Sequence, residues 1–369
     1  MLNGSRRLKA LFVADGSGGH LIPALETAVV LARTGADVRV WYAQRPQAGG
    51  WAQALAREIA GAAVAVAPIP VLAQPRLLDR LGESRRLWSR AAQCFASFGP
   101  DIVVGFGGWV SAPVVLAARL HRIKCVIHEQ NVVMGRANRW LARWVDRVAV
   151  TFPHSAWGRA VQTGLPVRSR IGTMSRMDAV ARAGFEASRP TLLVIGGSQG
   201  ARAVNRIVVD ALSHALDEER GRWQVLHLTG AADEAMVRRS YAERGMTAQV
   251  AAFVTGMADA YAAADLVIAR AGASTIAELA RCGLPAILIP YPHAQGHQRA
   301  NARLVATLGG AMVIEESALA PALLLEAIRR ILADAGAREA MRMGMRTLAV
   351  PDAAERLTGA ILEVAGGTS

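Results

Sequence analysis

The sequence is poor in cysteine and aromatic residues, and it has no long uninterrupted apolar run. Its three cysteines, Cys94, Cys125 and Cys282, are widely spaced and form no CxxC pair. This argues against a disulfide framework or a zinc site and fits a reducing cytosol. No stretch reaches the roughly 18 apolar residues of a membrane-spanning helix. The apolar stretch near the N-terminus is also too short for a secretory signal, so we expect a cytoplasmic protein.

Lysine is scarce as well. Only Lys9 and Lys124 occur among the 42 basic residues, and the formal net charge is +13. A genomic bias towards arginine and alanine codons explains this composition as well as a functional need does. The functional interpretation is attraction to nucleic acid or to an anionic membrane surface. No aromatic-rich basic face or nucleic-acid-reading motif occurs, so we expect no nucleic-acid partner.

Apolar bursts alternate with helical patterns along the chain. Strands are predicted at 8–14, 37–43, 102–105, 124–128 and 147–150, and again at 190–195, 225–228, 250–253, 266–269 and 286–290. The irregular stretch 163–189 separates the two series. This pattern predicts an α/β fold of two tandem domains with mostly parallel sheets. Ligands of such folds bind at the carboxyl ends of the strands.

Glycine-rich turns follow four of the predicted strands, at 16–19, 105–108, 196–201 and 270–275. Each turn precedes a helix, whose free N–H groups and positive dipole end suit a phosphate. A tight strand–helix turn explains one or two glycines, but four such junctions favour a phosphate-bearing ligand. None is a GxGxxG motif with a following acidic residue or a Walker A motif, which disfavours a nicotinamide dehydrogenase or an ATPase.

Polar side chains accompany these turns. His20 begins a helix, where the dipole lowers a histidine pKa and suits a general base, although an ordinary helix-terminal histidine is the alternative. Glu278 could accept hydrogen bonds from the two hydroxyls of a ribose; the alternative interpretation is an ordinary solvent-facing glutamate. The segments HEQN (128–131) and HAQGHQRAN (293–301) carry polar side chains that could hydrogen-bond a sugar. The alternative is that they only cap the neighbouring strand and helix.

Together these motifs resemble the MurG family over essentially the whole chain. The matching segments, in order, are GSGGH, GFGGWVSAPVVLAA, HEQN, GGSQGA, RAGASTIAELA and HQRANA. The resemblance implies inverting transfer of N-acetylglucosamine from UDP-N-acetylglucosamine (UDP-GlcNAc) to undecaprenyl-diphospho-muramoylpentapeptide (lipid I), which gives lipid II for peptidoglycan synthesis. It implies no cofactor and no metal.

The resemblance also implies a GT-B fold, with two Rossmann-like domains facing across a cleft. The acceptor- and membrane-facing domain would comprise 1–165 and 352–369, because the last helix returns to it. The UDP-sugar-binding domain would comprise 166–351. The protein would be peripheral on the inner face of the cell membrane and could have partner proteins of cell-wall synthesis.

Site residues are implied by position. His20 would be the general base or would orient the acceptor hydroxyl, and His128 is a second candidate for the base. Glu278 would bind the ribose, Val254 the uracil and Gln298, beside His297, the sugar. The full donor set is Asn131, Arg168, Ser198, Val254, Ala273, Ser274, Thr275, Glu278 and Gln298. The acceptor diphosphate would lie against Ser17, Gly18, Gly19, Gly107 and Gly108.

Four positions depart from the family pattern. The usual GGTGGH is DGSGGH here, so Asp15 adds a negative charge near a site meant for phosphate. Leu165 replaces the asparagine of NPVR, Met134 replaces a proline after HEQN, and Gly296 replaces an acidic residue before HQ.

The segment PRLLDRLGESRRLWSR (75–90) interleaves arginines with leucines and a tryptophan. Such a basic amphipathic helix suits an anionic membrane, although a solvated helix with a core-facing leucine stripe has the same pattern. We expect Arg76, Leu77, Arg80, Arg85 and Arg86 to contact the membrane. The functional alternatives are another GT-B UDP-sugar enzyme, such as a lipid galactosyltransferase or an epimerase, and a non-catalytic UDP-sugar- or membrane-binding paralogue.

Overall fold

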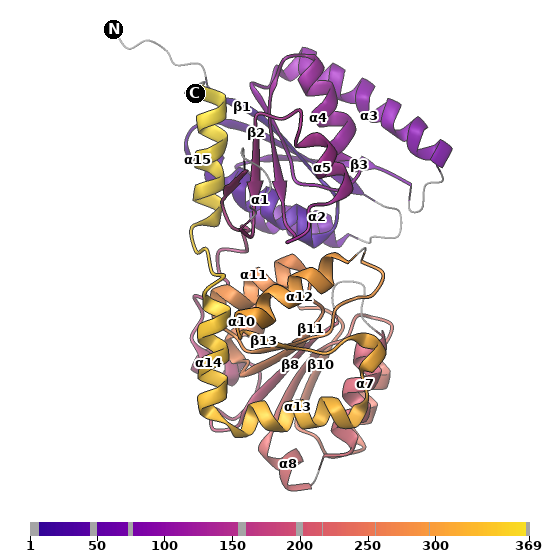
Figure 1. Cartoon of the computed structure of the whole chain (residues 1–369), viewed down its shortest axis with the longest axis vertical. Coiled ribbons are helices and arrows are strands. Elements are labelled where there is room, and N and C mark those ends of the chain that lie inside the picture. Colours follow the sequence, from indigo (N-terminus) through magenta and orange to yellow (C-terminus); the bar gives the residue numbers. More distant parts are fainter. Residues whose placement is uncertain are drawn as a thin grey trace. The chain divides into compact units, whose positions relative to one another are not determined.

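A computed structural model describes residues 7–44, 50–72, 77–153, 160–196, 202–215, 217–254, 256–294 and 296–366 (Figure 1). The chain divides into two compact units, residues 1–169 with 350–369 and residues 170–349. The boundaries expected from the sequence, after 165 and before 352, lie a few residues from these. We call the two parts the N-terminal unit and the C-terminal unit.

The described part of the N-terminal unit contains a parallel sheet of seven strands in the order β3-β2-β1-β4-β5-β6-β7. The strands are β1 (Lys9–Ala14), β2 (Asp37–Gln44), β3 (Ala65–Pro70), β4 (Ile102–Gly105), β5 (Lys124–Glu129), β6 (Arg147–Val150) and β7 (Ala160–Gln162). The sequence pattern missed β3, because Pro68 and Pro70 argue against a strand. An edge strand tolerates them, since one side of its backbone forms no ladder.

Helices cover both faces of this sheet. They are α1 (Gly18–Arg33), α2 (Trp51–Ala60), α3 (Leu77–Phe98), α4 (Ser111–Leu120), α5 (Arg136–Leu141) and α15 (Ala353–Gly366). Alternate residues of β1 point to opposite faces, so that Phe12 packs with α1, α2 and α15, whereas Val13 packs with α3, α4 and α5. The last helix of the chain, α15, therefore completes the core of the N-terminal unit, as expected.

The C-terminal unit repeats this plan with six described strands in the order β10-β9-β8-β11-β12-β13. These are β8 (Thr191–Ile195), β9 (Gln224–Leu228), β10 (Ala248–Ala251), β11 (Leu266–Ala269), β12 (Ala286–Leu288) and β13 (Ala311–Val313), and all of them pair in parallel. Buried β-branched and leucine side chains fill β8 and β11, as a sheet covered on both faces requires.

The helices of this unit are α6 (Arg176–Arg182), α7 (Arg202–Ser213), α8 (Asp217–Arg222), α9 (Glu234–Ala242), α10 (Met257–Ala263), α11 (Ala273–Cys282), α12 (His297–Thr307), α13 (Pro321–Ala333) and α14 (Ala335–Arg346), with a 3-10 turn at Glu316–Ala318. Residues of α7, α9 and α13 pack with β8 in one large core, while α6 packs against α10. Each unit therefore has its own core, and each presents the loops after its strands at one edge of its sheet.

Candidate functional site

Three loops of the N-terminal unit meet at the carboxyl ends of the neighbouring strands β1, β4 and β5. The turn after β1 leads into α1, the turn after β4 leads towards α4, and the HEQN segment closes β5. Phe106 N–H donates to Val13 O at 2.8 Å, and Gln130 Nε2 donates to Phe106 O at the same distance. These bonds tie the loops together, so residues more than 100 positions apart in sequence form one cluster.

Glycine is required where the loops touch. A Cβ atom on Gly16 would lie 1.8 Å from Ala43 O, which no side chain tolerates. Gly107 and Gly108 have φ values of +87° and +76°, in the left-handed region that favours glycine. A Cβ atom on Gly107 would also lie 2.9 Å from His20 Cδ2. The glycines of both turns therefore allow close approach of backbone and side chains at this edge.

His20 lies in the first turn of α1 and is partly buried. Its Nδ1 is 2.7 Å from Ser17 Oγ, the hydroxyl just before the helix begins. Its ring packs on Gly107, with Nε2 on that side. Ser17 therefore orients the imidazole, so that its Nε2 edge faces the second glycine turn. This arrangement suits a general base at the strand ends.

His128 has a different environment from His20. Its side chain is fully buried, and its Nε2 is 3.0 Å from Gly164 O. A carbonyl only accepts, so Nε2 carries the proton and Nδ1 accepts from Gln130 Nε2 at 3.3 Å. Burial lowers the pKa of His128 to about 4, against the smaller opposing effect of the Gly164 hydrogen bond. A buried ring with both nitrogens engaged favours a structural role for His128 over the role of base.

Glu129 organises the HEQN segment, a role that the sequence analysis missed. Its carboxylate is 2% exposed and accepts four hydrogen bonds. Oε1 accepts from the backbone and side-chain amides of Asn131, at 2.9 and 3.2 Å, and Oε2 accepts from Gly135 N and Asn138 Nδ2. The acid thus fixes Asn131, the residue expected to bind the sugar. The run of four consecutive polar residues at the end of a buried strand was the available signal.

Three of the departures from the family pattern lie in this unit, and all three side chains are buried. Leu165 and Met134 are 4% and 2% exposed, and Met134 belongs to the core under α3, α4 and α5. Asp15 is also buried, with its Oδ1 accepting from Ser17 N at 3.1 Å. Arg168, expected near the donor diphosphate, is partly buried beyond β7.

In the C-terminal unit, the strand ends around β11 carry several of the expected donor residues, whereas Asn131 and Arg168 belong to the N-terminal unit. Helix α11 begins at Ala273 after the N-cap Gly272, so the 273–275 segment lies at the positive end of the helix dipole. Ser274 Oγ is buried and has no hydrogen-bond partner within the described structure. Glu278, one turn further along, is 6% exposed and accepts from Tyr261 Oη at 2.8 Å. An unsatisfied hydroxyl and an oriented carboxylate on one helix suit a ligand with phosphate and hydroxyl groups.

Val254 lines a pocket of about 490 Å³ between α6, α10 and the loop after β10, together with Phe253 and the Arg182–Asp259 ion pair. The exposed fraction of Phe253 is 56%. A flat aromatic base fits beside such a ring. Gln298 lies in the first turn of α12, and its Oε1 accepts from Tyr291 N at 2.9 Å. Gly296, which replaces an acidic residue, caps this helix with a φ of +80°.

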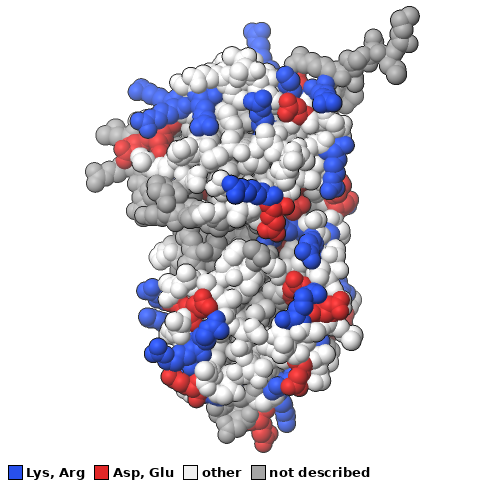
Figure 2. Space-filling model, turned by 180° about the vertical axis from the view of Figure 1, so that it is seen from behind, with Lys and Arg blue, Asp and Glu red and all other residues white. Residues whose placement is uncertain are grey.

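Ser198 and Arg76 lie outside the described residues, as do the side chains of Leu77 and Arg80. Arg85 and Arg86 are exposed on α3, beside Ser89 and Arg90, whereas Leu87 is buried beneath them. Basic side chains gather over this region at the upper left of Figure 2. The leucine stripe of α3 thus includes core-facing residues, and the basic face is the exposed one.

A second basic surface, which the sequence analysis missed, lies on and after α5. Trp140 and Trp144 are 45% and 53% exposed with ring centroids 6.4 Å apart, beside the exposed Arg139 and Arg143. The one-turn spacing of the tryptophans and of the arginines could have predicted this surface from the sequence.

No described helix is both long and apolar enough to cross a membrane. Within the same residues, no group of three or more His, Cys, Asp or Glu is arranged to hold a metal ion.

Comparison with known proteins identifies the family. The glycosyltransferase family 28 N-terminal and C-terminal domains match residues 10–150 and 191–357. A UDP-N-acetylglucosamine–N-acetylmuramyl-(pentapeptide) pyrophosphoryl-undecaprenol N-acetylglucosamine transferase of Desulfotalea psychrophila is 38% identical over 361 residues, covering 96% of each chain.

Solved structures agree with this assignment. The crystal structure of Acinetobacter baumannii MurG is 28% identical, with a TM-score of 0.75, and the match covers 96% of this chain and 99% of that one. A UDP-N-acetylglucosamine 2-epimerase from Listeria monocytogenes, 12% identical with a TM-score of 0.72 and coverage of 97% and 96%, shares the fold alone. The chain therefore belongs to glycosyltransferase family 28, among the MurG-type N-acetylglucosamine transferases.

Proposed function

We propose that this protein transfers N-acetylglucosamine from UDP-GlcNAc to the muramoyl group of undecaprenyl-diphospho-muramoylpentapeptide, converting lipid I to lipid II. The observation that carries the proposal is the 38% identity, over 96% of both chains, to a relative named for this reaction. The glycine turn before α1 and the start of α11 support it, because each follows a parallel strand and lies at a helix N-terminus, where phosphate groups commonly bind.

The N-terminal unit binds the acceptor in this proposal. The segments Ser17–Gly19 and Gly107–Gly108 lie at the strand ends, where backbone N–H groups suit the lipid diphosphate. His20 removes the proton from the attacking sugar hydroxyl, and because Ser17 engages Nδ1 we assign this transfer to Nε2. Asn131, fixed by Glu129, is assigned instead to the hydroxyls of the donor sugar.

The C-terminal unit binds the donor. The Glu278 carboxylate accepts hydrogen bonds from the ribose hydroxyls. Ser274 and the other N-terminal residues of α11 bind the UDP phosphates. The loop that contains Val254 contacts the uracil. The acceptor oxygen then attacks the sugar C1 from the face opposite to UDP, so the anomeric configuration inverts. Backbone N–H groups at the start of α11 stabilise the charge that develops on the leaving diphosphate.

We further propose that α3 and α5 hold the protein peripherally on the anionic cytoplasmic membrane face. Arginines near such a surface contribute about 1 kcal/mol each, and tryptophans prefer the headgroup region. Co-sedimentation with anionic and neutral lipid vesicles tests this: binding should be selective for the anionic vesicles and weaker in a Trp140→Ala/Trp144→Ala variant. Equal binding of that variant and the wild type would refute the role of α5.

The decisive experiment follows UDP release and lipid product in a mixture of purified protein, UDP-GlcNAc and a short-chain lipid I analogue. The proposal predicts release of one UDP for each disaccharide formed, only when both substrates are present. An epimerase would convert UDP-GlcNAc without acceptor, and a galactosyltransferase would prefer UDP-galactose. A non-catalytic paralogue would bind UDP and release none from the sugar nucleotide.

A further inference from the structure

Asp15 lies between the two glycine turns that the proposed function assigns to the acceptor diphosphate. Its side chain is only 6% exposed. On one side, Oδ1 accepts a hydrogen bond from Ser17 N at 3.1 Å. On the other side, a Cβ atom placed on Gly108 would lie 2.6 Å from Asp15 Cβ and 3.0 Å from its Oδ2. The carboxylate is therefore packed between the turn after β1 and the turn after β4.

A carboxylate at this position uses the same donors that a phosphate would use. Both anions accept hydrogen bonds from backbone N–H groups at a helix N-terminus. The Ser17 amide, directly before α1, already donates to Asp15. While this hydrogen bond persists, the amide is not available to a phosphate oxygen, and the negative charge of Asp15 repels an incoming diphosphate.

Gly16 constrains the turn, because any side chain there would collide with Ala43 O. Asp15 contributes a hydrogen bond through Oδ1, which an uncharged amide oxygen at the same position also accepts. The charge of Asp15 is thus a separable feature of this chain.

We propose that Asp15 is an internal anion that competes with the acceptor diphosphate for the turns of the N-terminal unit, and so lowers the affinity for the acceptor. This inference rests on the proposed function of the unit. When the diphosphate binds, it displaces the carboxylate from the Ser17 amide. Asp15 therefore acts on acceptor affinity, whereas the proton transfer is assigned to His20 Nε2.

Steady-state kinetics of Asp15→Asn and Asp15→Gly with the lipid I analogue test the proposal. Asparagine keeps an oxygen for the Ser17 amide and removes only the charge, whereas glycine also releases the amide. We expect the acceptor KM to fall about tenfold in Asp15→Asn and at least as far in Asp15→Gly, as the loss of one partly screened charge repulsion predicts. The kcat and the donor KM should stay within about twofold of wild type, since these steps do not involve the acceptor diphosphate.

Asp37→Asn is the matched control. Asp37 is exposed at the start of β2, at the amino ends of β1 and β2, so the variant makes the same change in net charge away from the turns at the carboxyl ends. Its acceptor KM should equal that of wild type. A similar fall in Asp37→Asn would assign the effect to overall charge and overturn the proposal.

Binding of inorganic diphosphate, measured by calorimetry with saturating UDP on the donor site, gives a readout independent of transfer. Asp15→Asn and Asp15→Gly should bind diphosphate more tightly than wild type and Asp37→Asn. If wild type transfers no N-acetylglucosamine, the proposed function fails while this binding measurement still tests Asp15. Unchanged or weaker diphosphate binding in both Asp15 variants overturns the inference, and so does a loss of kcat at constant acceptor KM.

Discussion

At the scale of single residues, His20 and Glu278 affect different kinetic quantities in the proposed reaction: His20 the kcat and Glu278 the donor affinity. His20→Ala removes the base, so kcat should fall by about 10²–10⁴-fold while UDP binding stays unchanged. Glu278→Ala removes two charge-assisted hydrogen bonds to the ribose, so donor affinity should fall by roughly 10–100-fold or more. Steady-state kinetics combined with UDP titration distinguish the two variants. Unchanged donor affinity in Glu278→Ala would remove its assigned role, and weakened UDP binding in His20→Ala would contradict a role confined to the acceptor.

The buried neutral His128 predicts a loss of stability in acid. Burial lowers its pKa to about 4 in the folded protein, below the ordinary value of 6.5, so the unfolded chain takes up the proton first as the pH falls. The contribution of neutral His128 to the free energy of unfolding is fully present above pH 6.5. It is lost as the pH falls towards 4, and this loss amounts to roughly 3 kcal/mol. Denaturant unfolding of wild type and His128→Asn at pH 7, 6, 5 and 4 checks this.

The asparagine variant carries no titrating ring, so its free energy of unfolding should depend less steeply on pH. His227, buried in the C-terminal unit with a pKa lowered to about 3 by burial, remains in both proteins and serves as an internal reference. Identical pH profiles for the two proteins would show that His128 does not carry the effect.

At the scale of elements, the sequence predicted the central strands and the glycine turns, because hydrophobic period and turn chemistry are local, but it missed the edge strands β3, β7 and β13. The GT-B fold and the last helix returning to the first sheet, which the resemblance implied, are confirmed. The contacts between loops could not be predicted from local patterns, because they join residues distant in sequence. Glu129 carries hydrogen bonds that arise only when β5 and α5 meet, and Asp15 meets Gly108 only when β1 and β4 pair.

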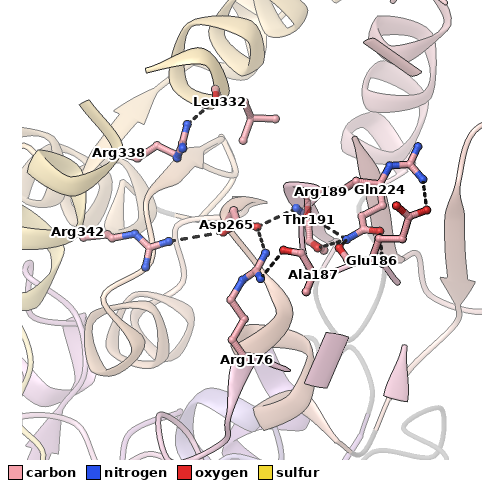
Figure 3. A network of polar contacts seen from close by, with 10 residues as sticks. All are labelled: Arg176, Glu186, Ala187, Arg189, Thr191, Gln224, Asp265, Leu332, Arg338 and Arg342. Atoms are coloured by element: carbon pink, nitrogen blue, oxygen red, sulfur yellow. Dashed lines mark hydrogen bonds and ion pairs between the residues drawn. The ribbon is translucent and has the colours of Figure 1, made fainter. Parts of the chain in front are cut away.

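Asp265 joins three elements of the C-terminal unit in the same non-local way (Figure 3). Its Oδ2 accepts from Thr191 N at 2.9 Å and pairs with Arg176 of α6 at 2.7 Å, while Arg342 of α14 lies 3.7 Å from Oδ1. Asp265→Ala leaves a backbone N–H and a partly buried guanidinium without their acceptor. We therefore expect a loss of roughly 2–3 kcal/mol in the free energy of unfolding.

The exposed Glu218, paired with Arg222 within α8, provides the control for this variant. Because both side chains of that pair are solvated, Glu218→Ala should cost less than about 1 kcal/mol. Chemical unfolding of both variants gives the comparison. Equal losses would mean that the Asp265 network contributes no more than a surface ion pair.

At the scale of the whole molecule, α15 follows the C-terminal unit in sequence but belongs to the N-terminal unit. Leu357 and Ile361 of α15 are fully buried in the core that contains Phe12 and Leu21. The core of the N-terminal unit is therefore complete only when α15 is in place, whereas the described core residues of the C-terminal unit include none from α15. A destabilising substitution in α15 should therefore lower the stability of the N-terminal unit and leave that of the C-terminal unit unchanged.

Leu357→Ala tests this division, because it leaves a cavity between α15 and α1 that should cost about 2–5 kcal/mol. Leu324→Ala, at a fully buried position of α13, is the matched change in the other unit. Hydrogen exchange followed by mass spectrometry reads the two units separately. Leu357→Ala should raise exchange in β1, β4 and β5 and leave β8 and β11 protected, with the reverse for Leu324→Ala. If Leu357→Ala loosens both sheets equally, the units unfold as one, and the independence of their cores is refuted.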